Sequence, residues 1–183
     1  DGTGTGYWLA QTFTSDTGFD IKNICMLMLN EGSCSDILIV GIRTVDANGV
    51  PTGTDVTNGT FPESLIGSKA WYNISLSEIT LDASVTYAIV ARTSSSCPID
   101  WYDQYPNGNY SGGSYFASYD YGSSWTNYTR DFDFMIWGEE VSSGNGTSSN
   151  QTGFWNLTGT YLYPSRLSYF VGIGTAMPRV GSL

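Results

Sequence analysis

Short runs of alternating apolar and polar residues, separated by turn-forming residues, constrain the fold of this chain more than any other feature. Seven such runs lie between residues 7 and 138: Trp8–Thr14, Ile21–Leu29, Ile37–Val45, Trp71–Ile74, Thr86–Arg92, Tyr115–Tyr119 and Phe132–Trp137. Alternation with a period of two places successive side chains on opposite faces of a strand. Short strands at close spacing predict an all-β protein, an antiparallel β-sandwich of the jelly-roll or immunoglobulin-like kind.

The residues between these runs support the same prediction. Asn48-Gly49, followed by Pro51-Thr52-Gly53, is typical of a tight turn, and Pro106-Asn107-Gly108 with Gly112-Gly113 is typical of a long loop. No stretch has a helical period with caps. Tyr, Trp and Phe total 27 residues against seven Lys and Arg, and aromatic side chains favour strands.

The composition divides the chain into three parts. Residues 1–138 form the predicted sandwich, residues 139–152 are a Ser/Gly/Asn-rich linker, and residues 153–183 are an apolar tail. About thirty residues cannot build an independent core, and apolar surface left in water costs roughly 25 cal/mol per Å². We therefore expect the tail to be an extended β segment that docks either on its own sandwich or on another chain.

The predicted strand Ile21–Leu29 is apolar on both faces. Ile24, Met26 and Met28 share one face, while Cys25, Leu27 and Leu29 share the other. A strand of this kind is covered on both sides. The second cover is either the tail or a neighbouring subunit, or else the strand is central and lies under long loops.

The net charge of −10 argues against nucleic acid and anionic membrane surfaces as partners, because both require clustered Lys and Arg. We expect a partner that is neutral, cationic or another copy of the chain. No apolar run reaches the roughly eighteen residues that a membrane-spanning helix needs, so membrane insertion is not predicted.

Seven Asn-x-Ser/Thr sequons without an intervening Pro occur along the chain, at Asn58, Asn73, Asn109, Asn127, Asn145, Asn150 and Asn156. Such a sequon is the acceptor for N-glycosylation in secreted proteins. Chance in a Ser/Thr-rich sequence is the alternative. We interpret the density of sequons as a sign of a secreted, glycosylated protein at a cell or virion surface.

Three cysteines cannot all pair within one chain. We expect a Cys34–Cys97 disulfide because both residues lie in loops between strands, and we expect Cys25, inside a strand, to be a free thiol. Three reduced, buried cysteines are the alternative. The spacing fits no zinc site, and there is no His to act as a ligand.

Enzymatic chemistry has little support in the sequence. A Ser or Cys nucleophile normally needs a base such as His, which is absent. Paired carboxylates could serve glycoside hydrolysis, and the acidic residues near aromatics are Asp100, Asp103, Asp120, Asp131 and Asp133. Acidic residues in surface turns are the ordinary interpretation, and we predict that the protein is not an enzyme. No cofactor is expected; Asp100, Asp103 and Asp120 could bind a structural Ca²⁺, although no D-x-D-x-D-G loop is present.

A series of short motifs and single residues is spread over residues 7–138. In order, they are Ala10-Gln11-Thr12-Phe13-Thr14, Gly32, Ile42-Arg43, Pro51-Thr52-Gly53-Thr54, Trp71, Leu81, Tyr87-Ala88-Ile89-Val90, Trp101, Tyr110, Gly112-Gly113, Ser118, Asp120, Gly122, Ser124-Trp125, Asp131-Phe132-Asp133-Phe134 and Gly138. In this order and spacing, residues 7–138 resemble the extracellular β-sandwich modules associated with choice-of-anchor surface proteins. The resemblance implies a surface location, and some members of the family are presumed to bind glycans. It implies location more than activity.

The tail contains Trp155-x-x-x-Gly159-x-x-Leu162-Tyr163, then Val171-Gly172-Ile173-Gly174-Thr175 with Pro178. This order resembles the VGIGT repeat of phage tail fibres and large secreted surface proteins. The resemblance implies a role in assembly rather than in chemistry. In strand addition, we expect Leu162, Phe170, Val171 and Ile173 to fill pockets on the partner.

Two functions follow from these observations. The first is a structural subunit of an extracellular fibre, pilus-like filament or virion appendage, which assembles with copies of itself through its tail. The second is a carbohydrate-binding or receptor-binding module, because aromatic and amide side chains crowd into residues 101–125 and suit sugar recognition. For the second function the candidate glycan-binding residues are Trp101, Tyr110 and Trp125. Aromatic residues are equally favoured in cores and subunit interfaces.

Overall fold

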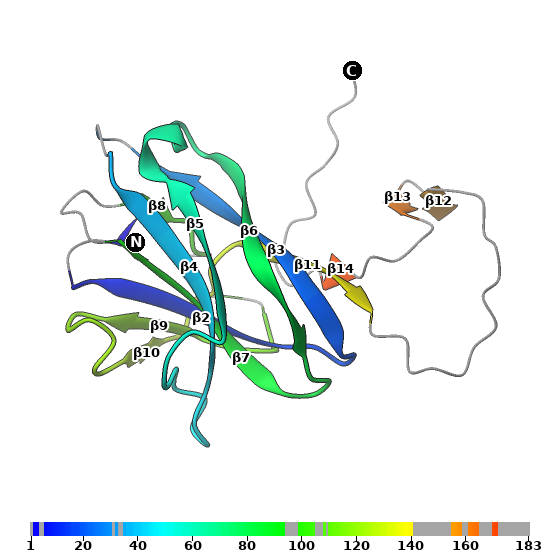
Figure 1. Cartoon of the computed structure of the whole chain (residues 1–183), viewed down its shortest axis with the longest axis horizontal. Helices are drawn as coiled ribbons and strands as arrows, with labels where there is room; N and C mark the ends of the chain where they lie inside the picture. Colours follow the sequence, from blue (N-terminus) through cyan, green and yellow to red (C-terminus); the bar gives the residue numbers. More distant parts are fainter. Residues whose placement is uncertain are drawn as a thin grey trace.

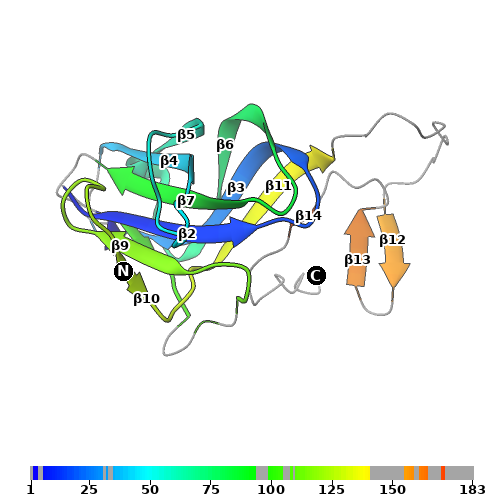
Figure 2. The same ribbon diagram turned by 90° about the horizontal axis from the view of Figure 1, so that it is seen from below.

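The computed structural model describes residues 2–3, 6–30, 32, 35–93, 99–104, 108, 110–140, 155–158, 161–164 and 170–171; for residue 140 and the three tail strands, only the backbone is described. Two antiparallel β-sheets lie face to face (Figures 1 and 2). The predicted all-β sandwich is therefore confirmed.

The first sheet, here called the β3 sheet, is built around β3 (Phe19–Leu29). On one side β3 pairs with β6 (Ala70–Leu81), and on the other with β11 (Phe134–Glu140) and β8 (Ile99–Trp101). Two short strands extend the sheet further. β14 (Phe170–Val171) pairs with β11, and β1 (Gly2–Thr3) pairs with β8.

The second sheet, the β2 sheet, has six strands in the order β10-β9-β2-β7-β4-β5. Their bounds are β10 Thr126–Tyr128, β9 Tyr115–Ser118, β2 Trp8–Thr14, β7 Thr86–Thr93, β4 Ile37–Thr44 and β5 Thr57–Pro62. Every pairing is antiparallel. Alternate residues of each strand therefore face the other sheet.

The core lies between the two sheets and contains the apolar positions of each alternating run. Ile24, Met26 and Met28 of β3 are fully buried there, opposite Leu9 and Phe13 of β2. Burial of these side chains supplies the main driving force for folding. The strand was predicted to be covered on both faces; the face with Ile24, Met26 and Met28 is in the core, whereas Cys25, Leu27 and Leu29 on the outer face are only half-buried.

The two sheets meet along one side of the sandwich, where β5 lies beside β6. The Thr57 hydroxyl donates a hydrogen bond to the Ser77 carbonyl oxygen. Gly59 lies so close to the Ser75 carbonyl that any Cβ there would clash with it. This side leaves little room for another strand; on the opposite side, the β3 sheet continues into β11 and β8, with β14 and β1 outermost.

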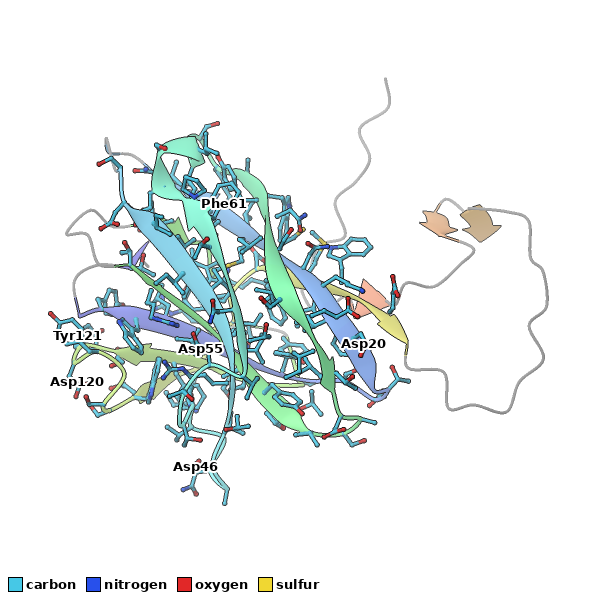
Figure 3. All side chains as sticks on the ribbon, in the orientation of Figure 1. Asp20, Asp46, Asp55, Phe61, Asp120 and Tyr121 are labelled. Carbon is cyan, nitrogen blue, oxygen red and sulfur yellow. The ribbon has the colours of Figure 1, made fainter. Side chains whose placement is uncertain are left out.

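A small polar cluster covers part of the outer face of the β2 sheet. Arg43 and Arg92 both form ion pairs with Asp55, and both guanidinium groups stack on the Trp8 ring, 5.0 and 5.1 Å from its centroid. Figure 3 labels Asp55, which comes from the loop between β4 and β5. Gly41, which lies beneath this carboxylate, has no room for a side chain.

The strand predictions hold for the strongly alternating runs and fail for short or polar ones. All seven predicted runs coincide with strands, but β6 continues to Leu81 and β11 starts at Phe134 and ends at Glu140. The strands β5, β8 and β10 were not predicted. The tail contains a separate hairpin of β12 (Trp155–Thr158) and β13 (Tyr161–Pro164). One 3-10 turn, η1 (Glu63–Leu65), interrupts the β structure of the described residues.

Two further observations bear on the sequence predictions. Within the described ranges, no helix is long and apolar enough to cross a bilayer. Cys25 carries a free thiol, while Cys34 and Cys97, the predicted disulfide pair, lie outside the described residues.

Candidate functional site at the β11 edge

Strand β11 has one apolar face in the core and one face on the outside of the sheet. Phe134 and Ile136 are fully buried between the sheets. Met135 and Trp137 lie on the outer face; Met135 is only 8% exposed, and Trp137 is half-buried. The alternation of the sequence Phe-Met-Ile-Trp therefore gives a strand that is apolar on both faces, as β3 is.

A bulge interrupts the pairing of β11 with β3 between Trp137 and Gly138. Any side chain at position 138 would clash with the Asp20 carbonyl oxygen and the Phe19 ring, so this close approach requires glycine. The extra residue is Lys22 of β3, because Asn23 pairs with Trp137 and Ile21 with Gly138. A bulge bends its strand, and here the bent strand is β3.

The tail reaches this edge through β14. Val171 pairs with Ile136 and Phe170 with Trp137, in antiparallel register. β14 covers two of the seven residues of β11 (Figure 1). Of the other predicted tail residues, Leu162 lies in β13, and Ile173 lies outside the described residues.

A hollow of about 460 Å³ opens on the outer face of the β3 sheet beside this edge. We call it the β11 hollow. It is lined from three strands, by Lys22, Asn23 and Cys25 of β3, Asn73 of β6, and Trp137, Gly138 and Glu139 of β11. The strand register explains the grouping, because Cys25 pairs with both Asn73 and Met135, and Asn23 pairs with Trp137.

The floor of the hollow is a short chain of polar contacts. The Cys25 thiol donates a hydrogen bond to Asn73 Oδ1, at 3.3 Å. Burial raises the pKa of the Cys25 thiol, and a hydrogen bond with the Trp137 side chain lowers it in part. The thiol is therefore mostly protonated at neutral pH and acts as a donor to Asn73.

Charged side chains lie at the other end of the hollow. Lys22 forms an ion pair with Glu78 of β6 and lies 3.9 Å from Glu139. The hydrogen bond to Glu78 raises the pKa of Lys22, and the nearby carboxylates act in the same direction. The hollow thus combines one aromatic ring, two amides, a thiol and opposite charges. The thiol donates its hydrogen bond to an amide oxygen, that of Asn73.

Three of the seven predicted glycosylation sites have described side chains, namely Asn58 on β5, Asn73 on β6 and Asn127 on β10. All three are exposed, as an acceptor asparagine must be. Asn156 lies in β12, of which only the backbone is described. Asn109, Asn145 and Asn150 lie outside the described residues.

The predicted glycan-binding aromatics do not form one surface. Trp101 is 1% exposed and stacks on Phe132 in the core, with ring centroids 4.2 Å apart. A core position does not fit a role in glycan binding, so the assignment of Trp101 needs correction: this indole is a packing residue. Sequence alone could not separate it from surface aromatics, because both uses favour the same residue types.

Tyr110 and Trp125 also pack against the protein. The Tyr110 hydroxyl accepts a hydrogen bond from the Thr14 N–H, and its ring meets Phe134 edge to face. Trp125 is partly buried on the outer face of the β2 sheet. The most exposed aromatics of this region are instead Tyr119 and Tyr121, at 65% and 63%.

Most of the carboxylates considered for catalysis or calcium binding hold the fold together. Asp131 accepts hydrogen bonds from Gln11 and from the Tyr110 N–H, and Asp133 accepts one from Gln104. Asp103 pairs with Arg130 at 2.7 Å, and Asp120 organises its own turn through Ser118 and Ser124. In the described part of the chain, no three acidic or thiol side chains gather as a metal site would require.

In comparisons with known proteins, no protein-family model matches the chain, and no curated protein matches it in sequence. The choice-of-anchor and VGIGT resemblances stay predictions. Any functional assignment therefore depends on the site itself.

Proposed function

We propose that the protein is a structural subunit of an extracellular fibre and assembles by strand addition, with the tail of one copy pairing with β11 of the next. The pairing of β14 with β11 carries this proposal. Main-chain hydrogen bonds to a sheet edge provide affinity, and side-chain pockets beside the edge provide specificity.

The length of the connection between the two strands supports an exchange between copies. Residues 141–169 separate β11 from β14 in the sequence. With residues 155–164 folded back as the β12–β13 hairpin, about 19 of these 29 residues can contribute length, and at roughly 3.3 Å per residue they span at most on the order of 60 Å. The β14 segment can therefore reach β11 of a neighbouring copy. The β14–β11 pairing within one chain would then use the same residues as the pairing between two copies.

The other strand edges are less suited to accept a strand. β5 lies against β6, so closely that a Cβ added at Gly59 would clash with the Ser75 carbonyl oxygen. β10 has only three residues, and one of them is the exposed sequon asparagine Asn127. β11 has seven residues, of which β14 pairs with two.

A tail that binds a different surface on the next copy makes a head-to-tail contact, and such contacts propagate into filaments when they do not close into rings. The acceptor and the donor lie in different parts of the same chain. Each added copy would therefore expose a new β11 edge at one end and a new tail at the other.

Electron microscopy of the native, unreduced protein tests this proposal, with a chain truncated after Ser149 as the variant. We expect filaments from the full chain and single particles from the truncated chain. Filaments from the truncated chain would refute the tail mechanism. Discrete particles from the full chain would favour the carbohydrate- or receptor-binding alternative, for which Trp125, Tyr119 and Tyr121 are the available aromatic side chains.

A further inference from the structure

We propose that the first sugar of an N-linked glycan on Asn73 occupies the β11 hollow and packs against Trp137. The glycan would then cover the outer face of the β3 sheet beside the edge that accepts a strand. This inference rests on the proposed extracellular location, where glycosylation occurs, and it concerns the surface next to the proposed assembly edge.

The backbone of β6 directs Asn73 to the correct side of the sheet. Ile74, the next residue, is fully buried in the core, so Asn73 lies on the outer face. It pairs with Cys25, which in turn pairs with Met135 of β11. Paired residues have Cβ atoms about 4.5–5.5 Å apart, so the hollow is only two inter-strand spacings wide, from β6 across β3 to β11.

The amide of Asn73 is already oriented for a glycan. Its Oδ1 accepts the hydrogen bond from the Cys25 thiol, which leaves Nδ2 as the atom that can carry a sugar. In the modification, a bond forms between Nδ2 and the anomeric carbon of the sugar. The bond from that carbon to a lipid-linked phosphate donor breaks, and the amide proton leaves with the phosphate. Oδ1 is unchanged, so the bond from Cys25 survives.

The remaining lining of the hollow suits a sugar ring. Trp137 provides a flat aromatic surface for the C–H face of the sugar, while Lys22, Asn23 and Glu139 provide donors and acceptors for its hydroxyl groups. The volume of about 460 Å³ lies in the range of small-molecule sites, roughly 300–1,000 Å³. Because the sugar would be tethered at the wall of the hollow, it would bind there at a high effective concentration.

The other two described sequons differ from Asn73 and provide matched controls. Asn58 and Asn127 lie at opposite ends of one row across the outer face of the β2 sheet, which runs Asn127, Phe116, Ala10, Val90, Gly41, Asn58. Both are on edge strands, and neither lines the β11 hollow. Glycans at these positions would leave the hollow unchanged.

The test measures alkylation of Cys25 in the full-length glycosylated chain, kept at a concentration where light scattering shows monomers. Peptide mass mapping reports both the glycan at Asn73 and the alkylation of Cys25. Ser75→Ala removes the sequon but keeps Asn73 and its bond to Cys25. We expect Cys25 to react severalfold faster in Ser75→Ala than in the native chain, and at the native rate in the controls Thr60→Ala and Thr129→Ala.

A second readout is the proton NMR spectrum of the native chain, in which sugar protons that lie over the Trp137 ring shift upfield. Equal Cys25 rates in all four proteins, or an Asn73 without glycan while Asn58 and Asn127 carry theirs, would overturn the inference. Neither readout requires filaments. If the assembly proposal failed, the glycan inference would still be testable by these two readouts. If the glycan inference failed, the assembly proposal would still be testable by electron microscopy.

Discussion

At the scale of single residues, Gly138 fixes the approach of β11 to β3. We expect Gly138→Ala to lower the free energy of unfolding by about 1–3 kcal/mol, because its Cβ would clash with the Asp20 carbonyl and the Phe19 ring. Urea denaturation measures the change. Gly67→Ala is the control, since a Cβ at that position meets no atom within 4 Å. Equal stability of the two variants would contradict the packing at the bulge.

Asp55 neutralises two guanidinium groups that have little access to water. The side chains of Arg43, Asp55 and Arg92 are 10%, 6% and 17% exposed. We expect Asp55→Ala to destabilise the fold by about 3–5 kcal/mol, because it leaves two nearly buried charges without their counter-ion. Glu78→Gln, which alters an exposed ion pair with Lys22, is the control and should destabilise the fold much less, because water screens the two charges. Thermal unfolding of both variants checks the contrast.

Ionisation of Tyr110 should lower the stability of the fold at alkaline pH. Burial raises the pKa of Tyr110 from 10.0 to about 12. The folded chain thus retains a proton that the unfolded chain loses, so this contribution is complete below pH 10 and is lost as the pH rises towards 12. We expect Tyr110→Phe to flatten the decline of unfolding free energy between pH 10 and 12. The exposed Tyr121→Phe should leave it unchanged, and an equal decline in all three proteins would count against this account.

At the scale of elements, the β14–β11 pairing should be sensitive to proline in the tail. Val171→Pro removes the N–H of a residue that pairs with Ile136 and restricts its backbone. We expect the concentration needed for filament formation to rise at least about tenfold, which corresponds to about 1.4 kcal/mol. Ser148→Pro, in the linker, is the control. Sedimentation of assembled protein measures both, and an unaffected Val171→Pro would exclude this pairing from assembly.

The strands that sequence could predict are those whose apolar residues repeat without interruption. Ile24, Met26 and Met28 are such a series, and they are the centre of the β3 sheet. The second half of β6 was missed because its alternation changes phase: Ile74 and Leu76 are followed by two successive exposed polar residues, Ser77 and Glu78, before Ile79 and Leu81. β8 and β10 have three residues each, too few for a period to be visible.

The site could be predicted only in outline. The apolar tail indicated a docked strand, and in the structure a tail strand pairs with a sheet edge, but nothing in the sequence identified β11 as that edge. The β11 hollow could not be foreseen, because Cys25, Asn73 and Trp137 meet only through the register of three strands. The prediction for Trp101 failed for a different reason. The cluster of aromatic residues around it predicted a binding surface, but the Trp101 ring stacks on Phe132 in the core.

At the scale of the whole molecule, the β5–β6 side of the sandwich has little room for another strand, and β14 pairs with β11 on the opposite side. Both the donor and the acceptor belong to the chain, and a long connection separates them in sequence. We therefore propose that β14 of one copy pairs with β11 of another during assembly. A measurement that identifies which copy supplies each strand distinguishes this exchange from the pairing within one chain.

That measurement is disulfide capture between two different variants, both carrying Cys25→Ala. One carries Trp137→Cys and the other Phe170→Cys, at positions that pair directly. A disulfide between these positions can form only between chains, and paired Cβ atoms lie close to the distance that it requires. We predict that mixed filaments give the 137–170 disulfide on mild oxidation, while Phe170→Cys with Ser123→Cys does not. Mixed filaments that assemble without the 137–170 disulfide would contradict strand addition at β11.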